Sequence, residues 1–152
     1  MKLWQKDNAS TNELIEKFTV GRDKEFDLLL ARYDVQGSIA HVKMLQQVGL
    51  MTPAEGALAV KGLEEILEEI DQQKFTIEEG IEDVHSQVEY LLTQRIGEAG
   101  KKIHSGRSRN DQVATDFRLW MLNKIPELHS TLLILQNALV EQAELAGETI
   151  MP

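Results

Sequence analysis

The chain has 152 residues, of which 42% are hydrophobic and 27% charged, and its formal net charge at pH 7 is −9. This length fits one domain or slightly more, and the acidic balance argues against a surface that binds nucleic acid. The sequence contains no cysteine, no apolar run long enough to cross a bilayer and no apolar signal region near residue 1, so we expect a cytoplasmic protein without disulfides that does not bind membranes.

The spacing of apolar residues predicts an all-α fold. Only three prolines and ten glycines occur, and most of them lie between periodic segments. Residues 1–20 are polar and weakly patterned, and we expect a loosely ordered arm there. The first helix is predicted from Asp34, where apolar residues begin to recur at helical spacing, to Gly49, a residue type typical of helix ends.

The next helix has a strong start signal at residues 52–55, Thr-Pro-Ala-Glu. This segment supplies a capping hydroxyl, a proline at the first helical position and a glutamate at the third. We expect the helix to end near Gln73 and to be followed by a connector over residues 74–81. A third helix is predicted from Val84 until Gly97.

The segment from Gly100 to Gln112 places four cations within nine positions of an otherwise acidic chain and leads into a helical pattern. The start of a helix leaves backbone N–H groups unpaired, so local positive charge there suits a small anion. The guanidinium groups of Arg107 and Arg109 can bind a carboxylate through paired hydrogen bonds, and Ser108 and Asn110 add neutral donors.

The same residues also fit a purely structural interpretation. In that case the segment is a solvated loop whose two arginines pair with Asp111, Asp116 or the acidic helices. Spacing alone does not decide between the two interpretations, because a turn rich in serine, arginine and asparagine is a weak motif.

A longer helical stretch is predicted from Val113 to about Ala146, with a kink or a one-turn break at Pro126. Its residues 132–135 are Leu-Leu-Ile-Leu, so the stretch is apolar on more than one side. A helix of this kind needs neighbours all round. We infer that these neighbours belong to other subunits or to chain not present here.

The histidines give weaker signals. His85 follows Glu82 and Asp83, so its imidazole fits either a tuned base or a structural hydrogen bond near a helix start, and the structural role is favoured. For His41, in the first helix, we expect burial with a hydrogen-bond partner. No spacing among the four histidines suggests a metal site, and we expect neither a metal nor a cofactor.

Three blocks of the sequence resemble argininosuccinate lyase and its lens-crystallin relatives. They are Asp-Val-Gln-Gly-Ser at residues 34–38, Glu-Asp-Val-His at 82–85 and His-Ser-Gly-Arg-Ser-Arg-Asn-Asp-Gln-Val at 104–113. They occur in the order and approximate spacing of that family, and the resemblance covers nearly the whole chain. The third block is highly specific to it.

The resemblance implies a helical homotetramer of the fumarase/aspartase superfamily, with active sites assembled from three subunits around a shared helix bundle. The implied reaction is elimination of arginine from argininosuccinate to give fumarate, a step of arginine biosynthesis. Residues 1–107 would then form a small helical N-terminal domain. Residues 108–152 would be the truncated start of the central bundle and contain its first long helix.

The matched block implies that Ser108, Arg109 and Asn110 contact the substrate. Arg107 and Asp111 lie in the same block, and with His85 they are candidates for supporting roles. In the family, a Gly-Tyr-Thr-His-Leu-Gln block follows the position of Pro152 and carries acid/base groups, so we expect no catalytic residue in this chain. We therefore interpret the chain as the N-terminal part of the enzyme, inactive alone.

One feature of the family is missing. Many members have a substrate-contacting serine upstream of the first block, but the corresponding stretch, residues 18–27, contains no serine. Two alternative functions remain at this point. One is a non-catalytic, crystallin-like structural protein on the same scaffold, and the other is a sister lyase such as adenylosuccinate lyase.

Overall fold

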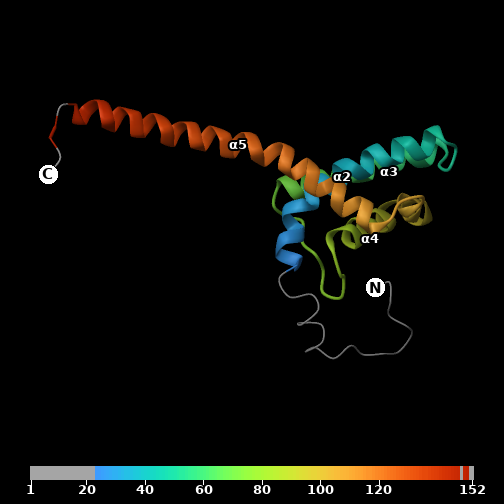
Figure 1. Cartoon of the computed structure of the whole chain (residues 1–152). Coiled ribbons are helices and arrows are strands. Elements are labelled where there is room, and N and C mark those ends of the chain that lie inside the picture. The colour runs from blue at the N-terminus through green and yellow to red at the C-terminus, as the bar shows by residue number, and fades with distance from the viewer. Residues whose placement is uncertain (1–22, 148, 151–152) are drawn as a thin grey trace. The chain divides into compact units, whose positions relative to one another are not determined.

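The structure is a computed structural model that describes residues 23–147 and 149–150, so the arm expected at residues 1–20 lies outside the described residues. The described chain consists of helices: α2 (Asp23–Gln47), α3 (Pro53–Asp71), α4 (Val84–Ile96), the 3-10 helix η1 (Gly97–His104) and α5 (Arg109–Ala146) (Figure 1). This confirms the predicted all-α class. Among the described residues, no helix is both long and apolar enough to span a membrane.

The chain divides into two compact units. The first ends at Phe117 and contains α2, α3, α4, η1 and the beginning of α5, whereas the second starts at Arg118 and contains the rest of α5. The domain boundary expected between residues 107 and 108 concerns the complete protein and stays a prediction.

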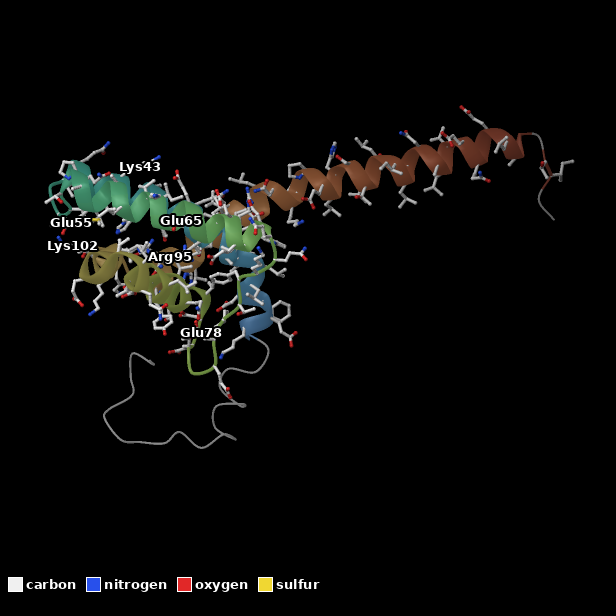
Figure 2. The ribbon with its side chains drawn as sticks, turned by 180° about the vertical axis from the view of Figure 1, so that it is seen from behind. Lys43, Glu55, Glu65, Glu78, Arg95 and Lys102 are labelled. Carbon is white, nitrogen blue, oxygen red and sulfur yellow. The ribbon has the colours of Figure 1, made fainter. Side chains whose placement is uncertain are left out.

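The first unit has one hydrophobic core, to which α2, α3 and α4 all contribute. Its fully buried apolar side chains include Val35, Val42, Leu45, Leu63, Ile66, Val84 and Leu92. Ion pairs reinforce the edge of this core, because Arg95 of α4 lies 2.7 Å from Glu69 and 3.8 Å from Glu65 of α3 (Figure 2). Of these helices, α2 and α4 also hydrogen-bond residues at the start of α5.

Helix α2 begins at Asp23, well before the predicted start at Asp34. Residues 26–30 are Phe-Asp-Leu-Leu-Leu, a run that hides the helical period, and Phe26 and Leu29 are exposed. Buried Ala31 and Val35 continue the apolar face of the helix. No proline or glycine interrupts the segment before residue 37, so the helix extends backwards without a break.

The start of α3 confirms the predicted capping box. The Glu55 backbone N–H donates to Thr52 Oγ1 at 3.2 Å, and the Thr52 N–H donates to Glu55 Oε2 at 2.9 Å. Lys102 of η1 also donates to Glu55 at 2.6 Å (Figure 2). The hydrogen bond from Lys102, followed by those from Thr52, lowers the pKa of Glu55 to about 2. The helix ends at Asp71, close to the predicted Gln73.

The basic segment is more ordered than a loop. Residues 97–104 form η1, and only residues 105–108 connect it to α5. Gly100 of η1 is buried, and a β-carbon there would lie 2.7 Å from both Cα and N of Thr93 in α4. Because this contact is with backbone, η1 can pack so closely on α4 only with glycine at this position.

Helix α5 passes through Pro126 without interruption, so the predicted one-turn break there is wrong. A proline removes one hydrogen bond from the helical ladder. The Ser130 hydroxyl donates to the Pro126 carbonyl at 3.0 Å, and the Thr131 hydroxyl donates to that of Glu127 at 3.0 Å. The helix extends over many turns on both sides of Pro126. The one backbone hydrogen bond that proline cannot form is therefore a small part of the hydrogen bonds of the helix.

We expect Gly100→Ala to lower the free energy of unfolding by about 1–3 kcal/mol, because the added methyl would overlap the Thr93 backbone. Urea unfolding followed by circular dichroism measures the change. Gly37→Ala is the matched control, since its β-carbon would meet Asp116 Oδ1 at an ordinary 3.6 Å. Equal destabilisation by both substitutions would contradict the packing argument.

Candidate functional site

Ser108 caps the start of α5. Its backbone N–H donates to Asp111 Oδ2 at 3.0 Å, its hydroxyl donates to the same oxygen at 2.8 Å, and the Asp111 N–H returns a hydrogen bond to Ser108 Oγ at 3.4 Å. The hydrogen bond from the Ser108 backbone, with that from its hydroxyl, holds the pKa of Asp111 below its usual value. Two candidate residues, Ser108 and Asp111, are thus paired with each other as a helix cap.

Arg109 is anchored to the start of α4. Its Nε lies 3.1 Å from Oδ2 of Asp83, the residue that caps α4, and its Nη2 donates to Ser86 Oγ at 3.1 Å. Its Nη1 donates to Gln112 Oε1 at 3.0 Å. These three contacts fix the guanidinium in one orientation, with 23% of the side chain still exposed. Asn110, the next residue, is exposed.

Arg107 turns in the opposite direction, toward the interior of the first unit. Its Nη2 donates to Ser38 Oγ of α2 at 3.1 Å. Burial lowers the pKa of Arg107, while the nearby charges of Asp34 and Asp116 act the other way. The side chain therefore serves the interior of the unit and does not form the solvated ion pair of the structural interpretation.

All four cations of the basic segment have acidic neighbours. Lys101 lies 2.7 Å from Glu98 and Lys102 lies 2.6 Å from Glu55. Arg109 pairs with Asp83, and the charges of Asp34 and Asp116 act on Arg107, whose hydrogen bond goes to Ser38. The positive charge of the segment is therefore locally offset, but of the two arginines only Arg109 forms an ion pair, and Asp83 was not among the partners expected for it.

Three buried side chains from three different helices meet behind the start of α5. They are Asp34 of α2, His85 of α4 and Asp116 of α5, which are 2%, 4% and 1% exposed. His85 Nδ1 lies 2.8 Å from Asp34 Oδ1 and 3.6 Å from Asp116 Oδ2. Gln112 Nε2 donates to the same Asp34 oxygen at 3.4 Å.

Sequence reasoning identified only His85 of this cluster. Asp34 and Ser38 lie four residues apart in α2, and Gln112 and Asp116 lie four apart in α5. Each pair therefore occupies one helix face, and all four residues are buried. Polar residues that recur at this spacing within a helical pattern could have indicated a buried network, but not which two helices meet.

The surroundings of His85 and Asp116 in the cluster shift the pKa values of these two residues upward. Burial by itself disfavours charged His85, but the hydrogen bond to Asp34 and the charges of Asp34 and Asp83 outweigh it and raise the pKa. Burial, assisted by the charge of Asp34, raises the pKa of Asp116 to about 7 despite the opposing charges of His85 and Arg107. Near neutral pH the cluster therefore retains a proton that the same groups would lose in water.

The same three side chains also offer donors suited to a divalent cation, since their ligand atoms all lie within 4.8 Å of one another. The positive charge of Arg107, however, already acts on both carboxylates. A bound cation would have to share the site with that charge. The expectation of no metal stays a prediction.

A cavity of about 650 Å³ lies beside Arg109 in the first unit. Its lining includes Ser86, Glu89, Tyr90 and His104 together with Arg109. His104, which lies in the third matched block, thus borders the same space as Arg109. Of the other histidines, His41 is half-buried with its Nε2 2.9 Å from the Ser105 carbonyl oxygen, so its partner is present but its burial is only partial.

Residues 6–152 match the model of a family described as lyase. The chain belongs to this lyase family. It is 49% identical over 151 residues to an argininosuccinate lyase of Bacteroides fragilis, an alignment that covers 99% of this chain and 34% of that relative. Argininosuccinate lyases of Moorella thermoacetica and Methylococcus capsulatus are 49% and 50% identical over 153 and 152 residues, covering 100% and 99% of this chain and 32% of each relative. The chain thus spans about a third of the length of these curated relatives.

The raised pKa values predict a stability that falls as pH rises. Between about pH 4, the ordinary pKa of an aspartate, and about pH 7, folded Asp116 keeps a proton that the unfolded chain has lost, and His85 extends the trend upward. We expect Asp116→Asn to flatten this dependence in urea unfolding over this range. Glu64→Gln, an exposed change on α3, is the control and should keep the wild-type slope.

Proposed function

We propose that this chain is the N-terminal part of an argininosuccinate lyase, a carbon–nitrogen lyase that eliminates arginine from argininosuccinate and leaves fumarate. The main support is the identity of about half over nearly the whole chain to proteins of that name. The geometry adds that Arg109 and Asn110 lie in the first turn of α5, where a carboxylate is favoured. The proposed setting is cytoplasmic arginine biosynthesis.

The chemistry explains the use of such a helix start. Removing a proton beside a carboxylate pushes negative charge onto the carboxylate oxygens. At the start of α5, the Asp111 N–H is bonded to Ser108 Oγ and the Gln112 N–H to the Ser108 carbonyl, which leaves the first two helical N–H groups for a ligand. Together with the Asn110 amide, these donors would stabilise the transition state more than the substrate.

The proposed contacts differ in kind. Asn110 is exposed and can donate directly, and Arg109 presents a guanidinium that Asp83 and Ser86 already hold in place. Ser108 would act chiefly by capping the helix, since its hydroxyl is engaged with Asp111. Arg107 and His85 would support this turn from the interior.

The acid and base of the reaction are proposed to lie outside this stretch of sequence. In support, the chain spans about a third of its curated relatives. The carboxylate closest to the helix start, Asp111, has a lowered pKa, which makes it a poor base. We therefore expect the chain to bind part of the substrate without turning it over.

We also propose that the chain associates with copies of itself, as a homotetramer in the complete protein. In the second unit, α5 exposes large apolar side chains on several sides, namely Leu122, Ile125, Leu128, Leu132, Leu133, Ile134, Leu135, Leu139, Val140 and Leu145. A patch of this size is unusual on a monomer in water. Packing in a helix bundle would cover it.

In the complete protein, we expect Asn110→Ala to lower kcat by about 100-fold or more, because one preorganised donor to the developing charge is lost. Fumarate release, followed by ultraviolet absorbance, measures the effect. Gln94→Ala removes an exposed amide from α4 and should leave the rate unchanged. A near-wild-type rate for Asn110→Ala would refute the assignment of this turn to the substrate.

For the isolated 152-residue chain, we expect association without catalysis. Sedimentation velocity should show species larger than a monomer, because association buries the exposed apolar side chains of α5. Incubation with argininosuccinate should yield no fumarate. Turnover by the isolated chain would disprove the proposal that the acid and base lie elsewhere, and a clean monomer would contradict the association.

A further inference from the structure

A chain of hydrogen bonds connects the buried cluster to Arg109. His85 Nδ1 donates to Asp34 Oδ1 at 2.8 Å, and Gln112 Nε2 donates to the same oxygen at 3.4 Å. The other end of the Gln112 amide, Oε1, accepts from Arg109 Nη1 at 3.0 Å. Because an amide donates at one end and accepts at the other, the negative charge of Asp34 fixes which end of Gln112 faces Arg109.

The residues of this hydrogen-bonded series are buried, which limits their rearrangement. Asp34, His85 and Gln112 are at most 5% exposed. Asp116 closes the cluster from α5, and its carboxylate lies against α2, where a β-carbon at Gly37 would be 3.6 Å from Asp116 Oδ1. Within the described residues, Oδ2 of Asp34 and Oδ2 of Asp116 have no hydrogen-bond partner, so burial and nearby charge, including His85 Nδ1 at 3.6 Å from Asp116 Oδ2, act on them instead.

The charges of the cluster balance only while it keeps a proton. Asp34 and Asp116 together carry two negative charges when ionised, and Arg107 and protonated His85 carry two positive ones. If a proton leaves, net negative charge remains in a buried site, which is costly. Other charged groups also act on these residues: Asp27 on Asp116, Asp83 on His85, Glu89 on Arg107, and Arg109 on both His85 and Arg107.

We propose that Asp34, His85, Asp116 and Gln112 form a positioning unit for Arg109, and that this unit holds the guanidinium in its binding orientation only while the cluster retains its proton. The proposal deepens the function proposed above and rests on it as regards catalysis. None of the four is a catalytic residue, since they act on Arg109 from behind, through Gln112.

A metal ion is the competing occupant of the cluster. The charges argue for a proton, because the guanidinium of Arg107 already interacts with both carboxylates. A divalent cation would displace the proton and leave one net positive charge in a site that a proton and Arg107 neutralise. The two occupants make opposite predictions for added metal.

The direct test is nuclear magnetic resonance of the full chain without substrate. We expect the Arg109 Nε–H resonance to shift with pH in step with the His85 ring, because both respond to the same proton. In Gln112→Leu, His85 should still titrate, but the Arg109 resonance should no longer follow it. Arg95, which pairs with Glu69 of α3, is the internal control and should not respond.

The kinetic test uses the complete protein with argininosuccinate. Gln112→Leu should raise KM by about tenfold through loss of a hydrogen bond to a charged group, with a smaller change in kcat. Asp116→Asn should move the pH profile of kcat/KM relative to wild type, which a purely structural residue would not do. Absence of turnover in the wild type would refute the proposed function alone, since the resonance test does not depend on it.

Three results would overturn the inference. The first is an Arg109 resonance that does not change with pH in the wild type. The second is one that follows His85 equally well in Gln112→Leu. The third is a stoichiometric rise in Tm on adding Zn²⁺ or Mn²⁺ that Asp116→Asn abolishes, since this would show a metal in place of the proton.

Discussion

The hydrogen bond between Asp34 and His85 is the contact on which the arrangement of the first unit depends. A carboxylate and an imidazole that are both almost fully buried are tolerable only if partners satisfy them. Those partners come from separate elements: Asp34 from α2, His85 from α4, and Gln112 and Asp116 from α5. The start of α5 is therefore held by polar contacts whose loss would leave buried charge unpaired, a stronger geometric restraint than apolar packing alone.

This restraint separates the roles of two arginines that are only two residues apart. Arg107 precedes the helix and points inward, toward Ser38 and the buried aspartates, whereas Arg109 lies in the first turn against Asp83 and Ser86. Both side chains carry a guanidinium, but of the two only Arg109 lines the cavity. The same residue type thus serves as an internal counter-ion in one place and as a candidate ligand in the other.

The features that were predictable from sequence are local. The capping box at Thr52, the helix stop near Gly49 and the all-α class follow from residue types within a few positions of each other. The early start of α2 was missed because the run at residues 26–30 hides the helical period, whereas the 3-10 helix η1 and the cluster around His85 were missed because they depend on packing between different elements. Gly100 is an example. Glycine is needed there because the backbone of Thr93 in α4 lies close to it, and the sequence pattern around Gly100 does not reveal that contact.

The paired state of the basic segment also bears on the proposed binding of a carboxylate at the start of α5. Its cations are largely neutralised by Glu98, Glu55, Asp83 and the buried aspartates, in a chain whose net charge is −9. Long-range attraction would therefore contribute little to the affinity for an anion. The affinity would come instead from donors with a fixed direction, which are the first two helical N–H groups, the Asn110 amide and the oriented guanidinium of Arg109. Donors fixed in this way favour a planar carboxylate at one position over anions in general. Selectivity of that kind depends on the angle of the α5 start, which is the quantity that the Asp34–His85 contact sets.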